Sequence, residues 1–184
     1  MTLFRNKYRI ESTRLPGYDY SQPGAYFVTI VTHNRECFFG DVVDGEMVLN
    51  NCGNIAKKFW LEIPDHFPNV ILDEFVIMPN HVHGIMILTV ETPKLGVSTK
   101  LGVSTTNTNT NLLPNKKRPT LGIIVNQYKR IVTINCKNRN QHFRWQRRFY
   151  DHIIRNERSL HTIRQYIYNN PLKWELDNEN PDKI

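Results

Sequence analysis

Residues Asp73–Leu88 read DEFVIMPNHVHGIMIL and predict two buried strands joined at Pro79-Asn80. Side chains alternate between the faces of a strand, so His81 and His83 point to one side. Two imidazoles one pleat repeat apart can bind a single metal ion while the strand holds them in place. They can equally be polar residues at a strand end that hydrogen-bond to backbone or water, and the spacing alone favours this second interpretation.

The bulk composition indicates a globular, basic protein. The chain has 184 residues, enough for one domain with a full core, and 40% hydrophobic with 22% charged residues excludes a disordered composition. The net charge of +7 and a pI near 9.4 favour an anionic partner. Nucleic acid is the commonest such partner, and a basic surface kept for solubility is the alternative.

Cysteine usage and the N-terminal sequence indicate the cellular compartment. Cys37, Cys52 and Cys136 are far apart and odd in number, which argues against a disulfide framework or a cysteine zinc site and fits a reducing cytoplasm. No apolar stretch resembles a signal peptide or approaches the roughly 18 residues that span a bilayer. We therefore expect a soluble, cytoplasmic protein.

The remaining segments predict the rest of an α+β fold. We expect a basic arm over 1–24, a strand over 26–32, a hairpin over 42–49, helices over 54–67 and from about 120, a strand or irregular edge segment over 143–154, and a last helix from Asn156 to Asn170. The tract 91–117 contains a perfect six-residue duplication and a Thr-Asn repeat, so it predicts a mobile loop without chemistry. After Trp174 the chain becomes acidic, and we expect a frayed tail over 176–184. The economical arrangement is one domain over 25–175, a ferredoxin-like antiparallel sheet sandwiched by helices.

The last predicted helix carries two polar residues beside its apolar seam. Ile163 and Ile167 belong to the seam, while Tyr166 and Asn170 lie one turn apart on its flank. A tyrosine hydroxyl with a pKa near 10 is a poor nucleophile unless it lies beside a metal-bound phosphate. Without further information, the residues favour a half-buried tyrosine that packs and hydrogen-bonds to backbone.

Three segments in the same order resemble the single-tyrosine HUH transposases, and most closely the REP-associated tyrosine transposases of bacteria. They are Pro79–Gly84 (PNHVHG), Trp145–Asn156 (WQRRFYDHIIRN) and Tyr166–Pro171 (YIYNNP). Two further segments, Arg14–Tyr20 and Asn34–Gly40, also resemble that family. The resemblance covers nearly the whole chain except 91–117.

The resemblance implies an HUH nuclease fold that acts on single-stranded DNA carrying hairpins. By this analogy His81 and His83 are metal ligands, Asn170 is the third ligand, and the ion is Mg²⁺ or Mn²⁺. Tyr166 corresponds to the nucleophile, which forms a 5′-phosphotyrosine bond and releases a 3′-hydroxyl without a nucleotide cofactor. Mobile relatives often have glutamine in place of Asn170. The resemblance further implies a bacterial, nucleoid-associated protein, either a monomer or a homodimer whose partner helices complete each site.

Other residues are assigned by position. Tyr168 is a rival nucleophile on the opposite flank of the seam, Tyr128 belongs to the core, and His152 either positions the site or is structural. Basic residues near aromatic ones fit DNA contact, although a solvated basic edge explains each of them singly. The candidates are Arg14, Lys116, Lys117, Arg118, Lys129, Arg130, Arg144, Arg147 and Arg148.

Two alternative functions remain open from the sequence. A non-catalytic module would bind DNA hairpins without cutting them, and the tyrosine at 166 argues against it. A metal-dependent hydrolase acting through water would cleave without a covalent adduct. It would need an additional carboxylate ligand, which the sequence pattern does not identify.

Overall fold

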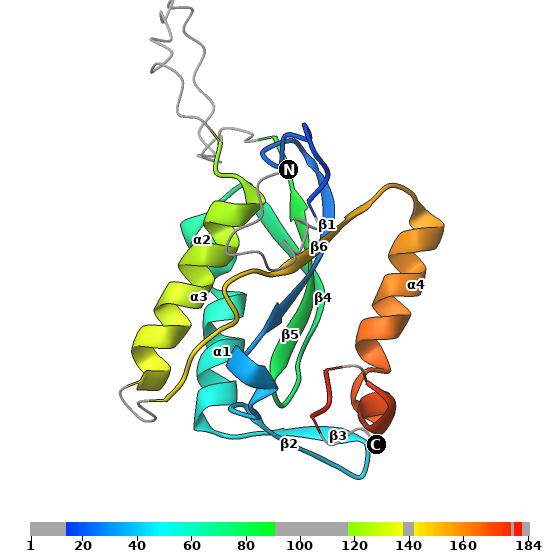
Figure 1. Ribbon diagram of the computed structural model, residues 1–184. Coiled ribbons are helices and arrows are strands. Elements are labelled where there is room, and N and C mark those ends of the chain that lie inside the picture. Colours follow the sequence, from blue (N-terminus) through cyan, green and yellow to red (C-terminus); the bar gives the residue numbers. More distant parts are fainter. Residues whose placement is uncertain (1–13, 91–117, 138–141, 178, 182–184) are drawn as a thin grey trace, which may run out of the picture.

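A four-stranded antiparallel sheet forms the centre of the molecule (Figure 1). The computed structural model describes residues 14–90, 118–137, 142–177 and 179–181, so the predicted loop 91–117 and most of the predicted arm lie outside the described residues. The sheet contains β1 (Gly24–Val31), β4 (Val70–Ile77), β5 (His81–Leu88) and β6 (Tyr150–Ile154) in the order β4-β5-β1-β6. With helices between β1 and β4 and between β5 and β6, this is the ferredoxin-like order, as predicted.

The helices cover both faces of the sheet. Helices α1 (Asn51–Leu61) and α3 (Leu121–Lys137) lie on one face, and α4 (Glu157–Tyr168) lies on the other (Figure 1). Along β1 the alternation of side chains separates the two cores. Tyr26, Val28 and Ile30 pack in the larger core with residues of α1 and α3, and Phe27 packs in a smaller core with residues of α4.

A hairpin and a short helix lie between β1 and β4, beside the main sheet. The hairpin of β2 (Gly40–Val43) and β3 (Glu46–Leu49) forms a separate two-stranded sheet, and Asp44 and Gly45 adopt positive φ angles of 52° and 77° at its turn. The predicted helix 54–67 is two helices, because α1 ends before Glu62 and the short α2 (Ile63–His66) holds Pro64 in its first turn. None of the helices in the described ranges combines the length and apolar character needed to cross a membrane.

Strand β5, which carries the two histidines, lies in the middle of the sheet. Both β1 and β5 are central strands, as predicted, and His81 pairs with Val31 at one end of the sheet. On the opposite face of β5, Gly84 lies against Trp60 of α1, and a Cβ atom there would lie 2.2 Å from the indole Cζ2. Because the residue after His83 is a glycine, the Trp60 indole can pack directly against the backbone of β5 on the face opposite the histidines.

Candidate metal and tyrosine site

His81 is fixed by a short chain of hydrogen bonds. Its side chain is fully buried, and its Nδ1 lies 2.8 Å from Oδ1 of Asn80. The Asn80 amide nitrogen donates to the backbone carbonyls of Arg35 and Glu179, which assigns Oδ1 as the acceptor. The imidazole Nδ1–H therefore donates to Asn80, and Nε2 keeps its lone pair for a ligand.

His83 points to the same side of β5 and contacts the last helix. Its Nδ1 lies 2.9 Å from Thr29 Oγ1, and its Nε2 lies 3.1 Å from the hydroxyl of Tyr166. The ring stacks on Phe27 at a centroid distance of 5.3 Å. The predicted nucleophile and the predicted ligand thus meet within one chain.

Both imidazoles are in the neutral form that binds metal ions. Burial lowers the pKa of His81 to about 4, partly offset by the charge of Asp177. Burial, with the neighbouring His81, also lowers the pKa of His83 well below its usual value. Metal binding therefore needs no proton release from either ring at neutral pH.

Tyr166 has its hydroxyl in the site, while the residue as a whole remains 45% exposed. Burial of the hydroxyl, followed by the charge of Asp177, raises the pKa of Tyr166 to about 12. The rival Tyr168 is 74% exposed and lines no part of this cleft, whereas Tyr128 is in the core and donates to the carbonyl of Ala56. Of these three tyrosines, Tyr166 is the one whose hydroxyl contacts a histidine of the site.

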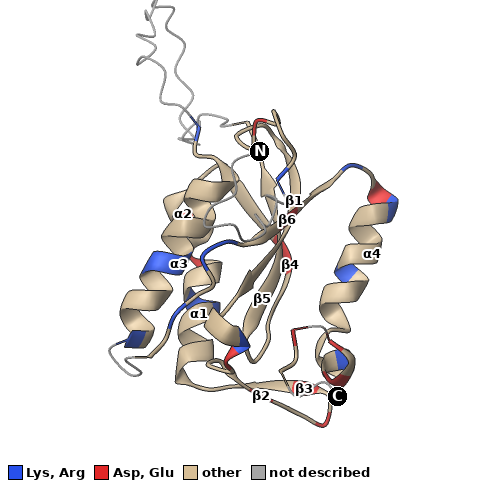
Figure 2. Cartoon of the chain, in the orientation of Figure 1, with Lys and Arg blue, Asp and Glu red and all other residues tan. Residues whose placement is uncertain are grey.

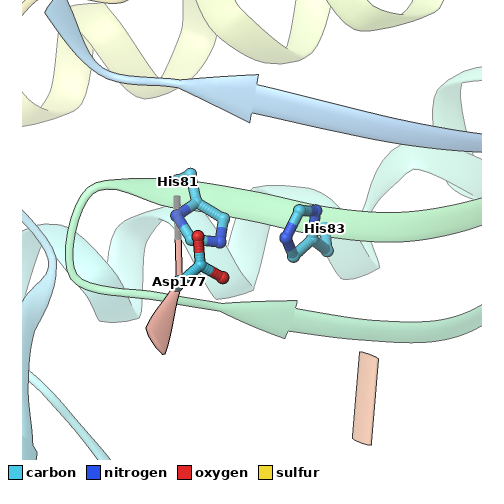
Figure 3. A group of neighbouring side chains, drawn as sticks. All are labelled: His81, His83 and Asp177. Carbon is cyan, nitrogen blue, oxygen red and sulfur yellow. The ribbon is translucent and has the colours of Figure 1, made fainter. Parts of the chain in front are cut away.

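The structure adds a carboxylate that the sequence pattern did not assign. The ligand atoms of His81, His83 and Asp177 all lie within 4.8 Å of one another. Figure 3 shows the two rings on the same side of β5, with the Asp177 carboxylate next to them. Asp177 lies about a hundred residues from the histidines and follows a short 3-10 helix, so no spacing rule could have identified it.

The segment around Asp177 is packed, in contrast to the frayed tail that the sequence predicted. A 3-10 helix, η3 (Pro171–Leu176), follows α4, and its Trp174 ring lies 6.0 Å from the ring of His81. Beyond it, Glu179 accepts from Arg35 Nε at 2.7 Å, and Asn180 donates to the carbonyl of Trp174. Asp177 and Glu179, which the sequence predicted to lie in a frayed tail, thus line the site that contains His83.

Asn170 lies at the site, as predicted, and two ligand atoms lack partners there. Its side chain is 2% exposed, and its amide nitrogen donates to Asp177 Oδ2 at 3.1 Å. Within the described residues, Asn170 Oδ1 and His81 Nε2 are buried without a hydrogen-bond partner. Buried polar atoms without partners are costly, so this donor set fits a bound cation.

A cleft of about 530 Å³ opens beside these groups. Its lining includes Tyr166, Asn170 and Asp177 together with Tyr150 of β6 and Lys173 of η3. Lys173 is exposed and had no assigned role in the sequence. The cleft leaves the tyrosine hydroxyl accessible from solvent.

Two features hold α4 in place above the sheet. Asn156 caps its N-terminus, as predicted, by accepting from the amide of Ser159. Arg164 donates twice to Asp73 on β4, through Nε at 2.8 Å and through Nη2 at 2.5 Å. The helix is therefore tied to the sheet near the residue that carries the hydroxyl.

One predicted DNA contact is wrong in its placement. Lys129 was expected on the outer face of α3, but its side chain is buried and Nζ donates to the carbonyl of Gln146 at 2.6 Å. The helical repeat places it beside Val125, Tyr128 and Val132, which are core residues. Lys129 anchors the neighbouring segment instead of facing DNA.

The other basic candidates lie at the surface, and their contact with DNA remains a prediction. Arg14 is stacked against Phe149 and lies 3.7 Å from Asp151. The remaining described candidates are exposed: Arg118, Arg130, Arg144, Arg147 and Arg148. Lys116 and Lys117 lie outside the described residues.

His152 is exposed on β6, opposite Phe27 in the strand register. It lines a different cavity from the one that contains Tyr166, and it makes no hydrogen bond to His81 or His83. Its predicted positioning role remains a prediction.

Comparison with known proteins gives relatives in sequence and in fold. No family model matches the chain. The chain is 44% identical over 168 residues to an "Uncharacterized protein" of Haemophilus influenzae, with 90% of each chain covered. It is 26% identical over 162 residues to a "Putative REP-associated tyrosine transposase" of the same bacterium, covering 84% of this chain and 74% of that protein.

A solved structure of a REP-associated tyrosine transposase bound to a REP hairpin has the same fold. The TM-score is 0.56 at 19% sequence identity, and the match covers 88% of this chain and 73% of that chain. The predicted fold is therefore confirmed, and the 44% identity places this chain in one family with the first Haemophilus protein.

Proposed function

Because this chain is a relative of the REP-associated tyrosine transposases and has their fold, we propose that it is a metal-dependent endonuclease and strand transferase for hairpin-bearing single-stranded DNA. The observation that carries the proposal is the 3.1 Å contact between the Tyr166 hydroxyl and His83 Nε2. That contact lies beside a group of side chains that fits a cation.

His81, His83, Asp177 and Asn170 are the residues that would hold the ion. Two neutral imidazoles, a carboxylate and an amide oxygen form a mixed nitrogen and oxygen set, which suits Mn²⁺ and leaves Mg²⁺ possible with additional water ligands. When bound, such an ion polarises a phosphoryl oxygen and offsets charge that develops during transfer. The carboxylate of Asp177 strengthens the predicted ligand set, which had only neutral members.

Tyr166 would carry out the covalent step. Its oxygen attacks the phosphorus, the bond to the 3′-oxygen breaks, and that oxygen leaves as a 3′-hydroxyl while the phenolic proton is released. The 5′-phosphotyrosine keeps the energy of the phosphodiester bond, so a second 3′-hydroxyl can reverse the reaction and join strands. With its pKa near 12 the hydroxyl is neutral at physiological pH. The described lining of the cleft has one cation, Lys173, beside the carboxylates of Asp177 and Glu179, so a divalent ion held there would be the main group that favours the ionised form.

The hydrolase alternative gains one observation from the structure. It requires an additional carboxylate ligand, and Asp177 supplies a carboxylate at the site. It does not explain why a tyrosine hydroxyl points at the same site, since an activated water needs no such group. The non-catalytic alternative explains neither feature.

A covalent-capture assay separates the three functions. Labelled single-stranded hairpin DNA is incubated with protein and Mg²⁺ or Mn²⁺, and covalent adducts are resolved on a denaturing gel. We expect an adduct with the unmodified protein and with Tyr168→Phe, the matched control from the same helix, and none with Tyr166→Phe. Cleavage by Tyr166→Phe without an adduct would establish the hydrolase, and hairpin binding without any cleavage would establish the binding module.

A further inference from the structure

The two histidines of the site differ in what their Nε2 atoms contact. Nε2 of His81 is buried without a hydrogen-bond partner among the described residues, whereas Nε2 of His83 lies 3.1 Å from the Tyr166 hydroxyl. An unprotonated ring nitrogen has one lone pair and a protonated one has none, so Nε2 of His83 cannot keep this hydrogen bond and bind an ion at the same time. The predicted nucleophile therefore occupies an atom of the ligand set.

The other ring nitrogen of His83 is held by Thr29 on the neighbouring strand. The two residues are directly paired in the register of β1 and β5, and Thr29 Oγ1 lies 2.9 Å from Nδ1. Neither strand contains Lys, Arg, Asp or Glu, and both are tan in Figure 2. No charged side chain on these strands therefore competes with the Thr29 hydroxyl for Nδ1.

Binding of an ion at Nε2 places the imidazole proton on Nδ1. A neutral imidazole has one N–H and one lone pair, so a lone pair at Nε2 requires an N–H at Nδ1. The Thr29 hydroxyl can accept from this N–H, and because Thr29 lines the cleft, its own proton can point to water there. A side chain without an oxygen at this position would leave the N–H buried and unpaired, which disfavours the tautomer that binds an ion.

The surroundings of Tyr166 allow its hydroxyl to leave His83. The ring centroids of the two residues are 5.1 Å apart, and the Phe27 ring packs edge-to-face against Tyr166 at 6.1 Å. The tyrosine is nevertheless 45% exposed. Packing therefore covers one side of the ring, and the cleft leaves space on the other side for the hydroxyl to move off Nε2.

We propose that the Tyr166 hydroxyl and a divalent ion bind alternately at His83 Nε2, and that Thr29 is the positioning residue which makes this nitrogen available to the ion. The hydroxyl leaves Nε2 when the ion takes its lone pair, so completion of the ligand set and release of the hydroxyl into the cleft are one event. No covalent bond changes in this exchange. The inference rests on the metal site of the proposed function and adds an order of events to it.

The exchange has two consequences of opposite sign for ion affinity. The hydrogen bond to Tyr166 lowers the apparent affinity by the fraction of molecules in which Nε2 is occupied, so its removal should tighten Mn²⁺ binding by about 2- to 10-fold. Removal of the Thr29 oxygen should weaken Mn²⁺ binding by about 10- to 100-fold, as for other groups that orient a ligating histidine. A general loss of stability would not produce opposite signs.

The test is calorimetric titration of the DNA-free protein with Mn²⁺, which involves no cleavage step. Tyr166→Phe is compared with Tyr168→Phe from the same helix, and Thr29→Val is compared with Thr89→Val. Thr89 follows the far end of β5, where its hydroxyl donates to the carbonyl of Asn69 outside the site. Thr29→Ser keeps the oxygen and should bind Mn²⁺ as the unmodified protein does.

Tighter binding by Tyr166→Phe and weaker binding by Thr29→Val, with both controls and Thr29→Ser unchanged, would support the exchange. Weaker or unchanged binding by Tyr166→Phe would overturn it, because the hydroxyl would then be a ligand itself or have no connection with the ion. Equal affinities of Thr29→Val and Thr89→Val, or equal losses in Thr29→Val and Thr29→Ser, would overturn the role of the Thr29 hydroxyl.

These outcomes are separate from those of the covalent-capture assay. If the affinities follow the expected order and no adduct forms with any DNA, the exchange stands and the proposed function fails. If adducts form while Tyr166→Phe and Thr29→Val bind Mn²⁺ like the unmodified protein, the proposed function stands and the exchange is overturned. Absence of Mn²⁺ binding in every protein would overturn the exchange together with the metal dependence.

Discussion

The ion pair between Arg164 and Asp73 should act as a rotational lock for the helix that carries Tyr166. Successive residues of a helix are about 100° apart, so Arg164 and Tyr166 lie on opposite flanks of the apolar seam of α4. On one flank, Arg164 donates two hydrogen bonds to the Asp73 carboxylate of β4. On the other flank, the Tyr166 hydroxyl contacts His83. Removing the tie leaves the apolar seam alone to resist rotation of the helix about its axis.

The magnitude follows from this geometry. The tyrosine oxygen lies roughly 9 Å from the helix axis, so a rotation of about 10° moves it by roughly 1.5 Å. A displacement near 1 Å costs about a hundredfold in rate when reacting groups must be aligned. The Arg164 side chain is 42% exposed, so solvent screens the ion pair and its own contribution to stability is small.

We therefore expect Arg164→Ala to slow cleavage by about 10- to 100-fold, with a fall in Tm of only about 2–4 °C. Cleavage rate at saturating hairpin DNA is the assay, and Arg158→Ala on the same helix is the control. The reversed pair Asp73→Arg/Arg164→Asp should recover much of the rate lost by either single change. Equal rates for Arg164→Ala and Arg158→Ala, or no recovery in the reversed pair, would refute the lock.

Three further perturbations test the ligand set, the support of β5 and the buried lysine. Asp177→Asn should weaken Mn²⁺ binding by about 10- to 100-fold in calorimetry, because a charged ligand becomes neutral, and unchanged affinity would remove Asp177 from the site. Gly84→Ala should lower the free energy of unfolding by about 1–3 kcal/mol in urea titration, since its Cβ would overlap Trp60, whereas Gly24→Ala meets only ordinary contacts and should cost far less. Burial lowers the pKa of Lys129 from 10.5 to about 8, so between these values the unfolded chain binds more protons and stability rises with pH. The rise should be about 1–2 kcal/mol after discounting partial exposure, and it should be absent in Lys129→Met, so equal increments in both proteins would contradict it.

The sequence predicted the sheet because its strands have strong local signals. The apolar alternation through Phe75 and Ile85, the turn at Pro79-Asn80 and the glycine turn at Gly45 are all short-range patterns, and each element formed where expected. The break at Glu62 was missed because the helical pattern continues across it, and Pro64 is tolerated in the first turn of a new helix.

The site was predictable where its residues lie on regular elements. The strand period places His81 and His83 on one face, and the helical repeat places Tyr166 and Asn170 on one flank of α4. Asp177 follows an irregular segment, where no period relates sequence to direction. Lys129 was misplaced because a charged residue was assumed to face solvent, whereas its ammonium group finds a backbone carbonyl inside the fold.

Diffraction from crystals grown with Mn²⁺, collected at the manganese absorption edge, tests the central claim most directly. A single anomalous peak should lie between His81 Nε2, His83 Nε2 and the Asp177 carboxylate, with the Asn170 amide oxygen and the Tyr166 hydroxyl next to it. A peak at another place, or well-ordered rings and carboxylate with no peak between them at saturating Mn²⁺, would contradict a metal-assisted tyrosine site.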